Sequence, residues 1–269
     1  MRKVATINSV ILVFILRLTT RGAASCALLL GLAGFLRAET NDFAARAGRA
    51  FHEAKLVVRK TPDDHHAAVH LARVSYDWAE FARDDEGREE IAQTGLAAAR
   101  AVLARESTNA AAHYWLGMNL GQLARTKTLG ALKLVREMEE MFHRARILDP
   151  HIDRAGPDRS LGRLYRDAPG WPTSIGSRKK SREHFENAIR LHPEFPDHQL
   201  ELLESLAEWG EKKNFQRQLS VTEKIITEAK TVFVGEPWES SWADWNQRLA
   251  KMKLRGENLS LGPTGRSGK

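Results

Sequence analysis

The stretch that decides the fold is GPDRSLGRLYRDAPGWPTSIGSRKKSREHFENAIRLHP, residues 156–193. Its first half predicts a helix, because Leu161 and Tyr165 lie four residues apart and so share one helix face. Pro157 precedes them, at a position in the first turn where a helix does not need the backbone N–H that proline lacks. Its second half predicts another helix, because Phe185 and Ala188 share one face before the final proline ends it. We therefore expect a helical hairpin here.

The spacing of these residues is typical of a tetratricopeptide repeat, a helix–turn–helix unit of 34 residues. The same positions recur elsewhere, at Leu71 and Ala72, at Leu116, Gly117, Phe142, Ala145 and Pro150, and at Leu202, Leu206 and Gly210. We predict an all-α fold, a right-handed TPR-like α-solenoid of about four helix-hairpin repeats over residues 39–254, with a C-terminal capping helix. The glycine-rich residues 255–269 are predicted to be a disordered tail.

Two neighbouring repeats are longer than the consensus unit. In the first, we place the excess at the turn around residues 124–129 or in extra turns of the second helix. In the next, the excess forms the loop DAPGWPTSIGS, residues 167–177. Insertions at the same point of successive repeats are expected on the same side of a solenoid, where a partner would bind.

The candidate binding residues lie in this loop and on the first helices of the repeats. Trp171 is predicted to anchor a protein partner from a loop stiffened by Pro172. The alternative is that Trp171 folds back and fills the gap that the insertion opens. The other candidates for partner or ligand binding are Tyr114, Trp115, Asn119, Arg125 and Tyr165.

The positive charge of the chain is concentrated at its N-terminus. The formal net charge is +7, but residues 1–38 contain five basic residues and no acid. The remaining 36 basic and 34 acidic residues leave a net charge of only +2, so we expect no nucleic-acid partner.

Residues 1–38 are interpreted as a signal peptide. The apolar run 23–35 has the length of a signal-peptide core, and Ala38 offers a small residue at the cleavage position. We therefore predict export to the periplasm. The alternative is an uncleaved N-terminal segment that anchors a membrane-tethered adaptor, which would bury Arg17 and Arg21 in the bilayer.

The single cysteine, Cys26, lies inside this segment. The preceding Ala-Ala-Ser faintly resembles a lipoprotein cleavage site, but the apolar run continues beyond the cysteine, which favours an unmodified residue. After cleavage near Ala38 the mature chain would have no thiol, so disulfides and cysteine catalysis are excluded.

No arrangement of residues predicts catalysis or a cofactor. His66 and His70 are spaced to share a divalent metal on one helix face, but no third ligand follows at adjacent spacing. We interpret them as solvent-facing, and a metal-dependent enzyme remains the alternative. The chain has no glycine-rich phosphate loop and no nucleophile elbow.

Near the C-terminus, Trp238, Trp242 and Trp245 form a stripe along one face of the predicted capping helix. Such a stripe usually packs the helix onto the preceding repeat. The alternative is a contact between copies of the chain.

Three stretches carry a narrower resemblance: HYWLGMNLGQLAR (113–125), ARILDP (145–150) and AGPDRSLGRLYRDAPGWPTSIGSRKKSREHFENAI (155–189). They resemble irregular tetratricopeptide proteins that include the T-component associated with tripartite ATP-independent periplasmic transporters and, more distantly, regulators of microtubule dynamics. The resemblance covers residues 110–210. It implies a non-catalytic periplasmic transport accessory that trimerises and contacts the transporter's solute-binding subunit.

Overall fold

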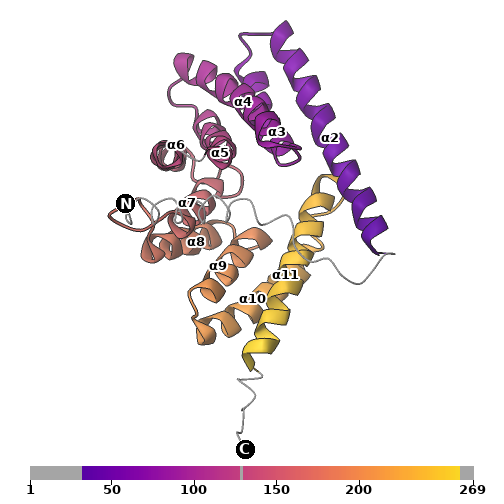
Figure 1. Ribbon diagram of the computed structural model, residues 1–269, viewed down its shortest axis with the longest axis vertical. Coiled ribbons are helices and arrows are strands. Elements are labelled where there is room, and N and C mark those ends of the chain that lie inside the picture. Colours follow the sequence, from indigo (N-terminus) through magenta and orange to yellow (C-terminus); the bar gives the residue numbers. More distant parts are fainter. Residues whose placement is uncertain (1–31, 128–129, 261–269) are drawn as a thin grey trace, which may run out of the picture. The chain divides into compact units, whose positions relative to one another are not determined.

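The computed structural model describes residues 32–127 and 130–260, and within them the regular structure is helical (Figure 1). The first helices are α2 (Leu32–Lys60), α3 (His65–Ala79), α4 (Asp85–Arg105), α5 (Ala110–Arg125), α6 (Ala131–Leu148) and α7 (Gly156–Asp167). They are followed by α8 (Arg178–Leu191), α9 (Pro196–Glu208), α10 (Lys212–Ala229), the 3₁₀ helix η2 (Glu236–Trp238) and α11 (Glu239–Ser260). The predicted all-α helical-repeat fold is confirmed.

The chain divides into two compact units, unit 1 (Met1–Arg178) and unit 2 (Lys179–Lys269). Most of the predicted signal peptide, Cys26 included, lies outside the described residues, as does most of the predicted tail. That residues 39–254 act as one domain therefore stays a prediction. None of the described helices is long and apolar enough to span a membrane.

Short polar side chains start three helices of unit 1, α3, α4 and α5. The side chain of Asp64 accepts hydrogen bonds from the backbone N–H groups of His66 and Ala67 at the start of α3. Asp84 and Asn109 cap α4 and α5 in the same way. Each cap satisfies N–H groups that have no partner inside the helix, so these residues fix where the helices begin.

In unit 1, α5 contacts α3, α4 and α6, and it is buried on almost every side. The small residues of the repeat pattern permit this close packing. A Cβ atom on Gly117 would lie 2.6 Å from the Phe142 ring, and one on Gly95 would lie 2.4 Å from the Asn119 side chain. These glycines are therefore needed where helices meet most closely.

Helices α6 and α7 run antiparallel, as two side-chain pairs show. Arg146 near the end of α6 binds Asp158 near the start of α7, at 3.0 Å, and Glu139 in the middle of α6 accepts a 2.5 Å hydrogen bond from Tyr165. Helix α7 therefore runs back along α6, and its last turn lies beside the middle of α6. That the two insertions lie on the same side of the repeats stays a prediction.

In unit 2, α11 packs on α9 and α10. The ring of Trp245 is buried against Phe195 and Phe233, with centroid distances of 5.7 Å to each. The three tryptophans therefore pack within unit 2, as predicted, although Trp238 lies in η2 and only Trp242 and Trp245 lie in α11. That they also join copies of the chain stays a prediction.

Candidate functional site

Residues 168–177, which we call the tryptophan loop, follow α7 and close on themselves. The Gly176 N–H donates to the Pro169 carbonyl at 2.8 Å, and the Ser177 N–H donates to the Tyr165 carbonyl in α7, also at 2.8 Å. Gly170 and Gly176 form an isolated β-bridge. The loop is thus a ring of backbone fastened to the helix that precedes it.

The base of the tryptophan loop belongs to the core of unit 1, and its tip does not. Ala168 is buried, and Ile175 packs against the same core. Trp171 at the tip is 89% exposed. Of the two sequence-based alternatives, the structure therefore supports the projecting Trp171. Whether Trp171 contacts a partner stays a prediction.

The predicted site residues Tyr114, Asn119 and Tyr165 are buried, and Trp115 nearly so. Asn119 donates to the Ala72 carbonyl of α3 and to the Trp115 carbonyl of its own helix, both at 2.8 Å. In this structure these side chains have almost no surface that a partner could contact. Neighbouring helices cover α5, with Tyr114, Trp115 and Asn119, on almost every side, and Tyr165 is buried on α7, so the expectation that these residues line an open surface is not met.

Tyr114 stabilises the turn at residues 153–155, and the sequence pattern did not predict this role. Its hydroxyl donates to Asp153 at 2.7 Å, and Arg159 binds the same carboxylate oxygen at 2.7 Å. Asp153, Arg154 and Ala155 all have left-handed backbone angles, with φ between 47° and 55°. This conformation is unfavourable for residues with a Cβ, so the buried hydrogen bonds stabilise the turn that enters α7.

Burial raises the pKa of the Tyr114 hydroxyl well above its ordinary value, and the charge of Asp153 raises it further. The hydroxyl therefore stays protonated and remains a hydrogen-bond donor. This is the chemistry of a structural link and offers no base for catalysis.

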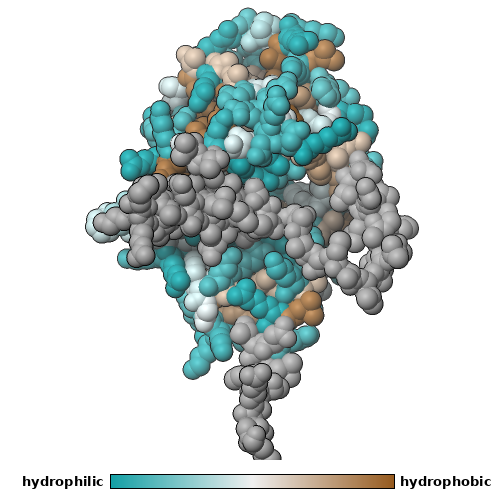
Figure 2. Space-filling model, viewed as in Figure 1, coloured by the Kyte–Doolittle hydropathy of each residue, from teal (hydrophilic) through white to brown (hydrophobic). Residues whose placement is uncertain are grey.

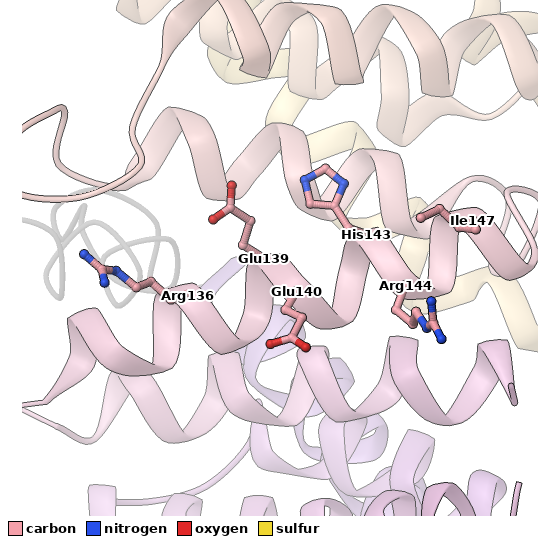
Figure 3. Close-up of a pocket in the computed structure, with 6 residues that line it drawn as sticks. All are labelled: Arg136, Glu139, Glu140, His143, Arg144 and Ile147. Atoms are coloured by element: carbon pink, nitrogen blue, oxygen red, sulfur yellow. The ribbon is translucent and has the colours of Figure 1, made fainter. Parts of the chain in front are cut away.

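Tyr165 contacts two residues, Glu139 and His143, that line a depression on α6 (Figure 3). The depression has a volume of about 540 Å³ and is lined by Arg136, Glu139, Glu140, His143, Arg144 and Ile147. Figure 3 shows Glu139 and His143 projecting from one side of α6 and Glu140 and Arg144 from the other.

The Tyr165 hydroxyl joins two of these residues. It donates to Glu139 and lies 3.1 Å from the His143 Nε2 atom. Burial, followed by the hydrogen bond to Glu139, raises the pKa of the Tyr165 hydroxyl. The phenol therefore stays neutral. The depression is lined by two arginines, Arg136 and Arg144, and two glutamates, Glu139 and Glu140.

Arg125, the last residue of α5, belongs to a network that joins three helices. It donates to Glu80 of α3 at 2.8 Å and to Gln122 at 3.2 Å. Gln122 in turn donates to Glu80 at 2.6 Å and accepts from Arg88 of α4 at 3.1 Å. Arg125 thus ties the ends of three helices together, which gives it a structural role.

Asp77 of α3 lies beside this network. The pKa of its carboxyl is raised to about 6, chiefly by burial; Arg73 partly offsets this effect, and the charges of Asp153 and Glu80 add to it. The folded chain therefore favours the neutral carboxyl. Stability from this group is complete below about pH 4 and is lost as the pH rises through about 6.

We expect Asp77→Asn, which keeps the side chain neutral, to remove this pH dependence. Because the Asp77 side chain is 46% exposed, solvent screens the effect, and we expect a gain of about 1 kcal/mol or less at pH 7. The measurement is urea unfolding of both proteins at pH 4, 5.5 and 7. Parallel pH profiles for the two proteins would contradict the prediction.

His66 and His70 are exposed on α3, and the neighbouring Asp64 is engaged as the helix cap. His65, not predicted as a contact, lies 3.2 Å from Glu106. Among residues 32–127 and 130–260, no three histidine, cysteine or carboxylate side chains are grouped so that they could hold a metal ion. In the described part of the chain, the structure therefore adds no third metal ligand to His66 and His70, which the metal-enzyme alternative would need.

Comparisons with known proteins agree with the repeat fold. Residues 37–155, less than half of the chain, match the family of regulator of microtubule dynamics proteins 1–3. A crystal structure of a thermophilic TPR protein of Thermus thermophilus is similar with a TM-score of 0.57 and 17% sequence identity, covering 81% of this chain and 97% of that one. No curated protein sequence matches this chain. These similarities support a TPR-like helical-repeat protein, a class that typically binds other proteins and is typically non-catalytic.

Proposed function

We propose that this protein is a non-catalytic scaffold that captures a protein partner with Trp171. The observation that carries the proposal is the 89% exposure of this side chain on a loop that is fastened at its base. Exposing a large aromatic ring to water is unfavourable, and tryptophans are prominent among the residues that dominate binding energies.

The structure of the loop also favours binding. Backbone hydrogen bonds hold the ring of residues 168–177, and Ile175 packs its base onto the core. Little loop entropy is therefore lost when a partner covers Trp171.

We expect Trp171→Ala to weaken partner capture at least about tenfold without changing the stability of the fold, because the side chain contributes almost nothing to the core. The measurement is capture of proteins from the protein's own cells on immobilised full-length chain, quantified by mass spectrometry. Trp171→Phe should retain part of the capture.

The matched control is Ile147→Ala, which truncates another exposed apolar side chain of unit 1, on α6. Undiminished capture by Trp171→Ala would remove the loop from the interface. Loss of capture only in Ile147→Ala would instead place the partner on the α6 depression.

The finer proposal is that the scaffold is exported and serves a periplasmic transporter, with a solute-binding subunit as the partner and a trimer as the working form. Its support is the resemblance over residues 110–210 and the signal-like segment 1–38. A mature chain that begins at Glu39 is the expected result of N-terminal sequencing. An intact leader on protein recovered from membranes would instead establish the tethered adaptor, and light scattering decides between monomer and trimer.

A further inference from the structure

The tryptophan loop contains no aspartate, glutamate, lysine or arginine in its ten residues, 168–177. In the whole chain 28% of the residues are charged, and the face of the molecule in Figure 2 is mostly hydrophilic. Burial explains the longer uncharged stretch 107–124, because it forms most of α5. The tip of the tryptophan loop, residues 170–173, is exposed, so burial does not explain its lack of charge.

The charged residues that flank the loop are attached at its base. Asp167 precedes the loop and pairs with Arg166 at 2.7 Å, and its side chain is only 15% exposed. Arg178 follows Ser177, whose backbone N–H is fastened to the Tyr165 carbonyl of α7. Both charges are therefore placed where the ring of backbone joins the helices, and the exposed tip carries none.

The tip is a tight turn that presents Trp171 together with Thr173. The backbone N–H groups of Thr173 and Ser174 both donate to the Gly170 carbonyl, at 3.1 Å and 3.2 Å. Trp171 and Pro172 thus occupy the two central positions of the turn. Thr173 closes the turn and is exposed, so a change at this residue reports on the partner surface next to Trp171.

An uncharged tip limits the kind of surface that can cover it. Removing an ionised group from water without a compensating partner is costly. A charged surface opposite the tip would lose its hydration and gain no opposite charge in return. An apolar pocket has no such cost, and it gains by covering the indole ring. A bilayer is less suitable, because stable membrane binding requires two signals and the tip offers one large apolar side chain and no base.

We propose that Trp171 inserts into an apolar pocket of the partner protein, and that the mouth of this pocket, facing Thr173, is uncharged. The proposal rests on the scaffold function proposed above and deepens it by naming the chemistry of the partner's surface. Association is then driven by burial of apolar area and depends little on salt.

The first test measures the salt dependence of capture. Full-length chain is immobilised, and mass spectrometry quantifies the proteins of its own cells that the unmodified chain captures and Trp171→Ala does not. Raising sodium chloride from about 50 to about 500 mM should lower their amount less than about threefold, because salt screens charge pairs and leaves apolar contacts intact. A larger fall would overturn the proposal and leave the scaffold function standing. Undiminished capture by Trp171→Ala would overturn both.

The second test introduces a charge of either sign beside Trp171. We expect Thr173→Lys and Thr173→Glu each to weaken capture at least about fivefold, because either charge must be desolvated at an uncharged mouth. Thr173→Gln is the matched control, since it adds an uncharged side chain of the same length as glutamate, and its capture should stay within about twofold of the unmodified chain. Thr173 is exposed, so circular dichroism of all three variants should be unchanged.

The outcomes separate the alternatives. Opposite effects of the lysine and glutamate variants would reveal a charged partner surface, and equal losses in all three variants would show that size limits the contact; either result overturns the uncharged mouth. Unchanged capture in all three variants would remove Thr173 from the interface and overturn it as well. Sedimentation with phosphatidylcholine vesicles should leave the full-length chain in solution, and Trp171-dependent sedimentation would show instead that a bilayer covers the tip.

Discussion

Replacing Arg248 by alanine is expected to destabilise unit 2 by about 3–5 kcal/mol. Arg248 of α11 is mostly buried, and it binds four carboxylates: Asp197 at 2.7 Å, Glu201 at 2.6 Å, Glu204 at 2.8 Å and Asp244 at 3.2 Å. These carboxylates, led by Glu204, raise the pKa of Arg248 well above its ordinary value despite the cost of burial. Without the guanidinium, the fully buried Glu201 loses a positive partner.

The measurement is urea unfolding followed by circular dichroism. Lys253→Ala is the matched control, because Lys253 is on the same helix but forms an exposed pair with Glu223, and such pairs contribute only about 0–1 kcal/mol. Adding Glu201→Gln to Arg248→Ala should recover part of the lost stability, since it neutralises the buried carboxylate. Equal stability of the Arg248 and Lys253 variants would contradict this account.

Replacing Gly176 by alanine is expected to force the tryptophan loop open. A Cβ atom at this position would lie 2.1 Å from the Ala168 carbonyl oxygen and 2.8 Å from the Pro169 backbone. Backbone atoms cannot move aside as a flexible side chain can, so the ring of residues 168–177 must rearrange. We expect a loss of about 2–3 kcal/mol, in the range of overpacked sites, together with loss of partner capture.

Gly170→Ala provides the control on the other side of the same β-bridge. Its added Cβ would meet only the Gly176 carbonyl oxygen, at 3.8 Å, an ordinary contact. We therefore expect Gly176→Ala, and not Gly170→Ala, to unfold at a lower temperature and to exchange hydrogen faster at the backbone amides of residues 176 and 177. Equal unfolding temperatures and exchange rates in the two variants would show that the closed ring does not determine the conformation of the loop.

The sequence predicted those parts of the repeat fold that depend on residues close together in the chain. Phe142 and Ala145 lie three residues apart, a helical spacing, and both are buried on α6. Pro62 follows the end of α2 at Lys60, because a proline disfavours helical backbone in the residue before it. A period of three to four residues reports directly on one face of one helix, so such positions can be read from a single sequence.

The structure agrees with the sequence on the exposure of Trp171, whereas partner binding by any of these residues stays a prediction. Asn119 was interpreted as a surface residue because it lies on a first helix, but its side chain bonds to Ala72, which is 47 residues away. Tyr114 similarly reaches Asp153 across 39 residues. No local pattern specifies such pairs, because they form only when separate hairpins stack.

The sequence by itself determined that this chain forms helical hairpins, since the small residues, caps and prolines that shape each hairpin act over a few residues. The tertiary structure alone decided which side chains remain at the surface. Closure of the loop by Gly176 leaves Trp171 exposed, and the packing of Phe233 and Trp245 leaves Val232 and Val234 exposed. Exposure depends on contacts between elements distant in the chain, so it is settled only when the helices have packed.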